Sequence, residues 1–225
     1  MLYILDTADL KAIEHCSRYY PLAGVTTNPS IIAKEKTDFY GLVKAIRSII
    51  GEDKMLHIQT TADKAENMLR EAERLKKNVG GNLYLKIPIS EEGLRAATLL
   101  KDDDQIGVTM TAVFTPQQAL ISAMAGADFV APYVNRLDNI TGDGVGVVRD
   151  IVKLFERHAL SCRVLAASFK NVQQVNDVAL AGCHSVTVNA DLMKQAISHP
   201  MTDSAVEGFT KDWRSVYGNK TILDF

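Results

Sequence analysis

The sequence has few cysteines and no long apolar run. Its three cysteines, an odd number without CxxC or Cys/His spacing, argue against a disulfide framework and against a zinc site. We interpret Cys16, Cys162 and Cys183 as buried apolar residues. Charged or turn residues interrupt each apolar run before it could span a bilayer, and residues 1–20 lack a basic segment followed by an apolar one. We therefore expect a cytoplasmic protein without a membrane partner.

The chain also lacks an excess of charge of either sign. With 25 basic and 27 acidic residues, its net charge is −2, so no strong field attracts nucleic acid or an anionic membrane. We expect no nucleic-acid partner, whereas an anionic small molecule needs only a few local positive groups. Low-complexity tracts and linkers are absent too, and 225 residues, 47% of them hydrophobic, match the length of one α/β barrel domain.

Short β-rich runs alternate with longer amphipathic segments along the chain. This alternation is typical of βα units and a parallel sheet. Eight such units most economically close into a single (β/α)8 TIM barrel, with its active site at the carboxyl ends of the strands. We expect the barrel to occupy residues 1–201. The predicted strands run from Leu2 to Leu5, Leu22 to Thr26, Met55 to Thr60, Asn82 to Ile87, Ile106 to Thr111, Asp128 to Pro132, Arg163 to Ala167 and Ser185 to Val188.

Polar capping residues mark the start of the helix after several of these strands. Thr115-Pro116-Gln117-Gln118 is a capping box with proline at the first helical position. Further caps lie at Asn28-Pro29 and Thr7-Ala8-Asp9, and Ser90-Glu91-Glu92 places acidic residues in a first helical turn. The glycine-rich stretch from Gly142 to Gly146 does not follow a strand directly and lacks the GxGxxG pattern. We interpret it as a mobile loop and helix entry, not as a dinucleotide site.

Residues 202–225 exceed what eight βα units require. They predict an extra helix that starts from a cap at Thr202-Asp203, followed by an apolar tail. The segment is either a lid packed on the barrel of its own subunit or an arm that docks on a neighbouring subunit, because an exposed apolar end is an association surface. Its apolar residues are Val206, Phe209, Trp213, Val216, Tyr217, Ile222, Leu223 and Phe225.

A lysine, Lys86, stands inside the apolar fourth predicted strand. Side chains alternate between the faces of a strand, so Lys86 shares one face with Tyr84. If both faces are buried, as in a parallel barrel, the ammonium loses its water. Burial can lower a lysine pKa by as much as roughly 3–5 units, which leaves a neutral amine that can attack a carbonyl. The alternative is a lysine at a strand end that reaches solvent.

Polar residues lie at or just beyond the carboxyl end of each predicted strand. Any one of them alone has an ordinary role, such as a helix cap or a turn residue. Together they would bring a lysine, an acid, a phenol, an amide and an arginine into one barrel mouth, which favours catalysis. These residues are Asp6, Thr26, Thr27, Asn28, Gln59, Lys86, Thr111, Tyr133, Arg136, Ser168, Lys170 and Asn189.

A lysine nucleophile that forms an iminium with a ketone needs specific companions. The Tyr133 phenol or the Asp6 carboxylate could carry protons to and from the carbinolamine, and Arg136 with Ser168 would suit a distant phosphate. A metal-dependent cleavage would instead require clustered imidazoles. The histidines are scattered, so we expect neither a metal nor another cofactor; they are His15, His57, His158, His184 and His199.

Four motifs at the strand ends are Gly24-Val25-Thr26-Thr27-Asn28-Pro29-Ser30, Lys86-Ile87-Pro88, Ala131-Pro132-Tyr133-Val134-Asn135-Arg136 and Leu165-Ala166-Ala167-Ser168-Phe169-Lys170. With these motifs the chain resembles the transaldolase family, and most closely its small bacterial branch, the fructose-6-phosphate aldolases. The resemblance runs from Asp6 to about Trp213. It implies a Schiff base on Lys86. It also implies a homo-oligomer, a pentamer that can stack as a decamer, with the last helix reaching across a subunit boundary.

The resemblance assigns roles to the other residues at the strand ends. Asp6 would act near the substrate hydroxyls at the bond that is cleaved. A water would be held by groups matching Gln59, Thr111 and Tyr133. Asn28 would contact the donor, and Arg136 with Ser168 would hold the phosphate. Thr26 and Ala131 complete the expected substrate-binding residues.

Two positions divide the branches of the family. Transaldolases resemble one another in carrying glutamate and phenylalanine where this chain has Gln59 and Tyr133. A phenol can protonate the enamine and release dihydroxyacetone, so we favour an aldehyde-lyase that reversibly cleaves fructose 6-phosphate to dihydroxyacetone and glyceraldehyde 3-phosphate. The alternatives are a transaldolase acting on sedoheptulose 7-phosphate and a non-catalytic barrel that binds sugar phosphates.

The chain departs from that branch at three positions. Met110 and Phe114 stand where the branch usually has glycine and tyrosine, and Asn189 stands where an apolar residue is usual. Met110 either points outward and fills space between strand and helix, or points inward and narrows the pocket. These differences bear on donor preference more than on mechanism.

Overall fold

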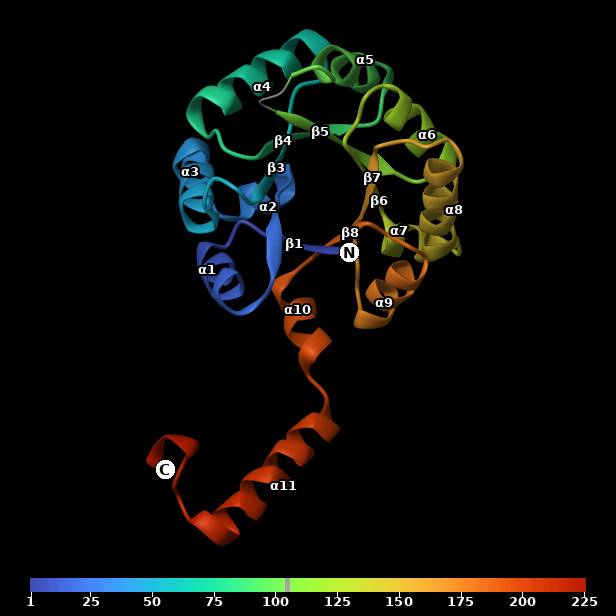
Figure 1. Cartoon of the computed structure of the whole chain (residues 1–225). Helices are drawn as coiled ribbons and strands as arrows, with labels where there is room; N and C mark the ends of the chain where they lie inside the picture. The colour runs from blue at the N-terminus through green and yellow to red at the C-terminus, as the bar shows by residue number, and fades with distance from the viewer. Residues whose placement is uncertain (104–105) are drawn as a thin grey trace.

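A computed structural model gives the fold of the chain and describes residues 1–103 and 106–225. Eight parallel strands pair in sequence order, and β8 pairs with β1 to close the barrel. Figure 1 shows the helices as an outer ring around these strands. The predicted TIM barrel is therefore confirmed. The strands are β1 (Leu2–Asp6), β2 (Leu22–Thr26), β3 (Met55–Gln59), β4 (Leu83–Pro88), β5 (Gly107–Val113), β6 (Phe129–Pro132), β7 (Arg163–Ala166) and β8 (Ser185–Val188).

The caps predicted after the first, second, fourth and fifth strands form where the sequence places them. Asn28 accepts a hydrogen bond from the backbone of Ile31, and Thr115 and Gln118 make both halves of the capping box. Asp143 caps α8, which confirms a helix entry in the glycine-rich stretch. The helices are α1 (Leu10–Tyr19), α2 (Pro29–Lys34), α3 (Phe39–Ile50), α4 (Ala65–Asn78), α5 (Glu91–Leu100), α6 (Pro116–Met124), α7 (Val134–Asp138), α8 (Gly144–Arg157), α9 (Val172–Leu180), α10 (Ala190–Ile197) and α11 (Pro200–Tyr217).

The main core lies between the barrel wall and the helices. It contains the outward-facing strand residues and the apolar stripes of the helices. Met110 belongs to this layer and is fully buried there, so it fills space between β5 and its helix and does not narrow the barrel interior. A smaller apolar cluster, Ile4, Met55, Phe129 and Leu165 with Ala23 and Tyr84 packed against it, fills the lower part of the interior.

A buried arginine joins the amino-terminal ends of β3 and β4. Arg47 on α3 is 4% exposed, and its guanidinium donates to the carbonyl oxygens of Gly51, Lys54 and Asn82 at 2.8, 2.7 and 3.0 Å. Burial lowers the Arg47 pKa, and nearby Glu52 opposes this effect. The three carbonyls thus gain charge-assisted donors where the chain enters two neighbouring strands.

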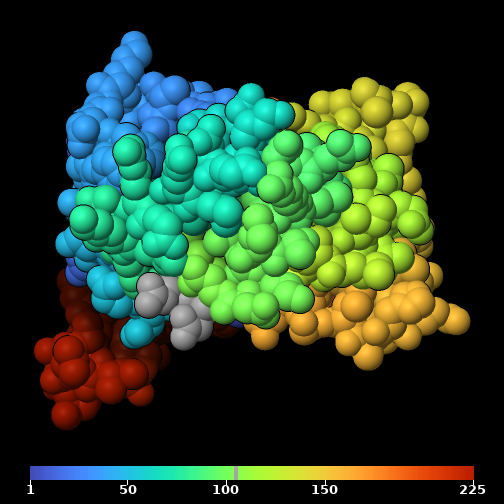
Figure 2. All heavy atoms as spheres, turned by 90° about the horizontal axis from the view of Figure 1, so that it is seen from above, coloured from blue at the N-terminus to red at the C-terminus, as the bar shows by residue number. Residues whose placement is uncertain are grey.

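The C-terminal segment projects away from the barrel (Figure 1). Helix α11 begins at Pro200 with His199 as its cap, three residues before the predicted cap at Thr202, because the His199 ring accepts the Met201 backbone N–H. Residues 194–225 are all exposed, so α11 does not form a lid on its own barrel. A short 3-10 turn, η1 (Ile222–Asp224), follows, and in Figure 2 the red C-terminal residues stand out from the packed body.

Candidate active site

Interior side chains of the barrel lie in layers contributed by alternate strands. The register places Lys86 of β4 level with Thr26, Ala131 and Thr187 of the other even-numbered strands. Asp6, Gln59 and Thr111 come two residues after interior positions of β1, β3 and β5, and so lie one layer nearer the mouth. The layer below Lys86 holds Ile4, His57, Thr109 and Leu165.

Lys86 is buried within this stack of layers. Its side chain is 5% exposed, and the amino group donates a hydrogen bond to the Thr27 carbonyl oxygen at 2.8 Å. Burial lowers the pKa of this amine from its ordinary value of 10.5, and the charge of Asp6 opposes that effect. The prediction of a desolvated lysine is thereby met: the interior disfavours the ammonium and increases the population of the neutral amine.

The Asp6 carboxylate lies at the mouth, at the end of a short chain of hydrogen-bonded hydroxyl groups. The Thr26 hydroxyl donates to the Asp6 carboxylate at 2.7 Å and lies 2.6 Å from the Thr187 hydroxyl. Thr26 and Thr187 are both buried, whereas Asp6 is partly exposed. The carboxylate therefore has a fixed position above the layer of Lys86 and keeps access to a ligand in the mouth.

Tyr133 is held on the opposite side of the mouth. Its hydroxyl is 3.1 Å from that of Thr111, and its ring meets Phe114 edge-on with centroids 5.5 Å apart. The Arg136 guanidinium carbon lies 4.8 Å from the centre of the same ring. A positive φ of 58° at Ala112 accompanies the irregular pairing between Met110 and Val113, so the chain turns sharply next to Thr111.

A backbone hydrogen bond joins the segments that carry Arg136 and Ser168. The N–H of Asn135, next to Arg136, donates to the Ser168 carbonyl oxygen at 2.8 Å, and Ser168 has a positive φ of 63°. Arg136 is exposed and Ser168 is partly buried. The start of α7 and the end of β7 thus form one side of the mouth, with a cation and a hydroxyl on it.

Some of the other predicted site residues lie close to Lys86 or at the mouth, whereas others serve the loops around it. Gln59 pairs in register with Lys86, and Ala131 is a buried neighbour in the lysine layer. Asn28 caps α2 beside the mouth. Asn189 is an exposed cap of α10 that accepts from the Leu192 backbone, and Lys170 is exposed beyond β7. The backbone N–H of Lys170 donates to the Gln174 side chain, so both residues serve the local structure of the loops after their strands.

Sequence reasoning missed three residues of this interior. Thr187 extends the hydroxyl chain of Asp6, and His57 with Thr109 lies directly below Lys86. The signal was present for Thr187, because Ser185, Thr187 and Asn189 alternate on one face of β8. For the other two, the contact between a side chain of β3 and one of β5 depends on the register of both strands with β4, which the sequence does not show.

Residues 1–103 and 106–225 contain neither a candidate membrane span nor a candidate metal cluster. Within these ranges no helix combines the length and apolar character that crossing a bilayer requires. The same ranges contain no group of three or more His, Cys, Asp or Glu side chains arranged to hold a metal ion.

Fold and site together define a TIM barrel with a buried, desolvated lysine at the carboxyl end of β4, an arrangement suited to amine chemistry on a carbonyl. Among solved structures, thiamine phosphate pyrophosphorylase from Pyrococcus furiosus is similar with a TM-score of 0.59 and 13% identity, over 84% of this chain and 85% of that one. A mandelate racemase/muconate lactonizing protein from Paracoccus denitrificans, complexed with magnesium, is similar with a TM-score of 0.57 and 12% identity, over 85% of this chain and 55% of that one. At such low identity these similarities concern the fold alone.

The sequence profile described as Transaldolase/Fructose-6-phosphate aldolase matches residues 3–220. The chain belongs to the transaldolase/fructose-6-phosphate aldolase family. It is accordingly an enzyme of this family with activity on sugar phosphates.

Proposed function

We propose that the protein is a metal-independent Schiff-base aldolase that reversibly cleaves fructose 6-phosphate to dihydroxyacetone and glyceraldehyde 3-phosphate. The observation that carries the proposal is the Lys86 amine, 5% exposed and with a lowered pKa, at the carboxyl end of the barrel. A neutral amine in that position is the group needed to attack the ketone of the sugar. The Tyr133 and Asp6 side chains on two sides of the mouth supply the proton transfers.

In the proposed reaction Lys86 adds to the ketone carbon and forms a carbinolamine. Loss of water, with a proton delivered by the Tyr133 phenol through the water held by Gln59 and Thr111, gives the iminium. The Asp6 carboxylate takes the proton of the hydroxyl on the fourth carbon. The bond between the third and fourth carbons breaks, its electron pair moves into the iminium to form an enamine, and glyceraldehyde 3-phosphate leaves. Protonation of the enamine and hydrolysis release dihydroxyacetone.

The other residues bind the substrate in this proposal. Arg136 and Ser168 hold the phosphate, because the backbone bond from Asn135 to Ser168 joins the two segments that carry this guanidinium and this hydroxyl. Asn28 contacts the dihydroxyacetone part. Thr26 and Ala131, which share the layer of Lys86, shape the floor under the donor.

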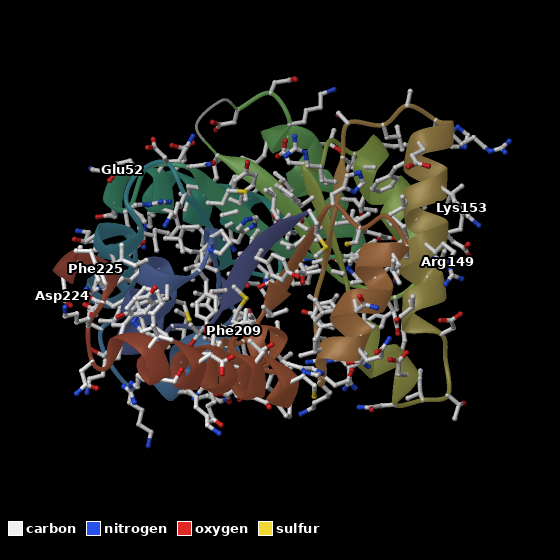
Figure 3. All side chains as sticks on the ribbon, turned by 60° about the horizontal axis from the view of Figure 1, so that its bottom comes forward. Glu52, Arg149, Lys153, Phe209, Asp224 and Phe225 are labelled. Carbon is white, nitrogen blue, oxygen red and sulfur yellow. The ribbon has the colours of Figure 1, made fainter. Side chains whose placement is uncertain are left out.

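Borohydride trapping tests the covalent step. Incubation with dihydroxyacetone and borohydride should add one reduced donor to the protein, and peptide mass spectrometry should find it on Lys86. The Lys86→Met variant should take up none. Lys153 projects from α8 into solvent and serves as an internal control for nonspecific labelling (Figure 3). An unlabelled Lys86 in the native protein would refute the Schiff-base mechanism and favour a barrel that only binds sugar phosphates.

The presence of Tyr133 rather than phenylalanine favours the aldolase over the transaldolase reaction. Its hydroxyl is positioned by Thr111 at 3.1 Å, where it can protonate the enamine. Fructose 6-phosphate supplied without an acceptor aldehyde should therefore yield free dihydroxyacetone. A protein that releases dihydroxyacetone units only when erythrose 4-phosphate or another acceptor is added would instead be a transaldolase.

We also propose that residues 202–225 pack on a neighbouring subunit of a homo-oligomer, a pentamer or decamer. The support is the exposure of every residue from 194 to 225, among them Phe209 at 72% and Leu223 at 95%. Light scattering of the full chain should give the mass of an oligomer, and removal of residues 199–225 should reduce that mass. An unchanged mass after truncation would contradict the role of the arm.

A further inference from the structure

The His57 ring fills the layer of the barrel interior directly below Lys86. Of its four residues, Ile4, Thr109 and Leu165 are aliphatic or small, and His57 is the only ring; none of the four is more than 1% exposed. His57 precedes Gln59 by two residues on β3, and Tyr84 precedes Lys86 by two residues on β4. Both rings therefore point into the barrel under the amine.

The His57 ring is fixed on three sides. Its Nδ1 lies 2.9 Å from the Thr109 hydroxyl, and its plane stacks on Tyr84 with centroids 4.5 Å apart and an angle of 12°. Phe129 meets the same ring edge-on at 5.5 Å. Gly107 makes room for this stack, because a Cβ there would lie within 2.3 Å of the Tyr84 ring.

His57 also carries an unsatisfied polar atom. Its Nε2 is inaccessible to solvent and has no hydrogen-bond partner among the described residues. Such an atom costs free energy in the native state and calls for a functional or structural reason. Burial, and next the charge of Lys86, lower the His57 pKa to about 3, so the imidazole stays neutral at working pH.

We propose that His57 is a positioning residue for Lys86: with Tyr84 and Phe129 it closes the barrel directly below the lysine and keeps water from its amino group. The inference rests on the proposed function, because it concerns the neutral amine that the reaction needs. The imidazole can exclude water below Lys86 only if it remains unprotonated, since a second buried cation would disrupt the packed interior.

The charged and titratable groups around the Lys86 amine determine how its pKa should change when His57 is removed. Asp6 on β1 favours the ammonium, whereas burial disfavours it. His57 on β3 is neutral, Tyr84 lies beneath it, and Tyr133 lies toward the mouth. Removing the His57 ring leaves space beside the Thr109 hydroxyl, and a polar space of that size admits water. Hydration would raise the lysine pKa toward its ordinary value.

Competitive labelling with acetic anhydride over a pH series measures this effect directly. Peptide mass spectrometry gives the labelling midpoint of Lys86, with exposed Lys153 as the internal standard. His57→Ala should raise the midpoint by about one pH unit or more and lower the neutral-pH rate of borohydride trapping about tenfold per unit, with recovery at high pH. The double variant H57F/T109V replaces both polar partners by apolar groups of similar shape and should keep the native midpoint.

The labelling midpoints of the two variants test the role of His57. An unchanged midpoint in His57→Ala would overturn the proposal, and so would a double variant with the same shift as alanine. If the alanine variant does not fold, His57→Asn, smaller and able to bind water, takes its place with the same expectation. A native Lys86 with a low midpoint that forms no adduct with dihydroxyacetone would refute the proposed reaction but leave the role of His57 intact.

Discussion

Replacing Lys86 by methionine should make the protein more stable at neutral pH, although it should abolish Schiff-base formation. The side chain is 5% exposed, and burial outweighs the favourable charge of Asp6 and lowers its pKa. Each unit of that lowering is worth about 1.4 kcal/mol of destabilisation while the group is charged. Methionine fits the same unbranched space and carries no charge. Lys86 thus imposes a stability cost on the native state that methionine does not.

The magnitude follows from two opposing effects. Methionine removes the cost of burying an ammonium, but it also removes the 2.8 Å hydrogen bond to the Thr27 carbonyl oxygen. A hydrogen bond of this kind contributes about 0.5–1.5 kcal/mol net. The Asp6 carboxylate keeps its bond from Thr26 at 2.7 Å in either case. We therefore expect a net gain in the free energy of unfolding at pH 7, which equals about 1.4 kcal/mol for each unit of pKa lowering minus the contribution of the lost hydrogen bond.

The gain should depend on pH in a specific direction. Because the folded-state pKa lies below 10.5, the unfolded chain binds more protons between the folded-state value and 10.5. The native protein therefore gains stability as the pH rises through that window, and the methionine variant lacks this gain. The difference between the two proteins should be largest below the folded-state pKa and should shrink as the pH approaches 10.5.

Urea unfolding followed by circular dichroism from pH 7 to 10, at one fixed protein concentration, measures the difference. Lys153→Met makes the same chemical change at an exposed position and should alter stability by less than about 0.5 kcal/mol at every pH. A Lys86→Met variant that is less stable than the native protein at pH 7, or whose advantage does not change with pH, would refute the account of a desolvated lysine.

Three further substitutions probe the mouth, the lower edge and the interior of the barrel. Tyr133→Phe removes the hydroxyl 3.1 Å from Thr111 and should lower dihydroxyacetone release about 100-fold or more while donor trapping persists, as measured by paired assays. Arg47→Met leaves three backbone carbonyls without their charged donor and should lower the free energy of unfolding by about 3 kcal/mol in urea titrations. Gly107→Ala places a Cβ within 2.3 Å of the Tyr84 ring and should lower the free energy of unfolding by about 1–3 kcal/mol.

The fold was predictable because its signals are local. Helix starts depend on residues three apart, as in the Thr115 and Gln118 capping box, and these pairs can be recognised in the sequence. Strand limits were less certain: β5 continues to Val113, two residues beyond the prediction, through an irregular pairing that no periodic pattern reveals. Helix α11 began early for a similar reason, since a histidine ring can cap a helix but is not among the usual capping residues.

The candidate site was predictable only in part, and the part that was missed has one physical cause. Alternation along a strand placed Lys86 and Tyr84 on one face, and position at a strand end selected Asp6 and Tyr133. What lies beside and beneath the amine depends on how far each strand is shifted against the next around the closed barrel. That shift brings Thr187 to Thr26 across β1, a contact of 2.6 Å between residues 161 positions apart.

The same shift explains why a histidine in β3 bears on a lysine in β4. Strand alternation alone makes His57 an inward residue, and scattered histidines gave no reason to consider it further. Closure places it one layer below the amine, bonded to Thr109 at 2.9 Å and stacked on Tyr84. We infer that the lowered pKa of Lys86 depends on the layer beneath it as much as on its own strand. A barrel that places a nucleophile above a closed, neutral floor can keep it dry from below while the mouth remains open to the sugar.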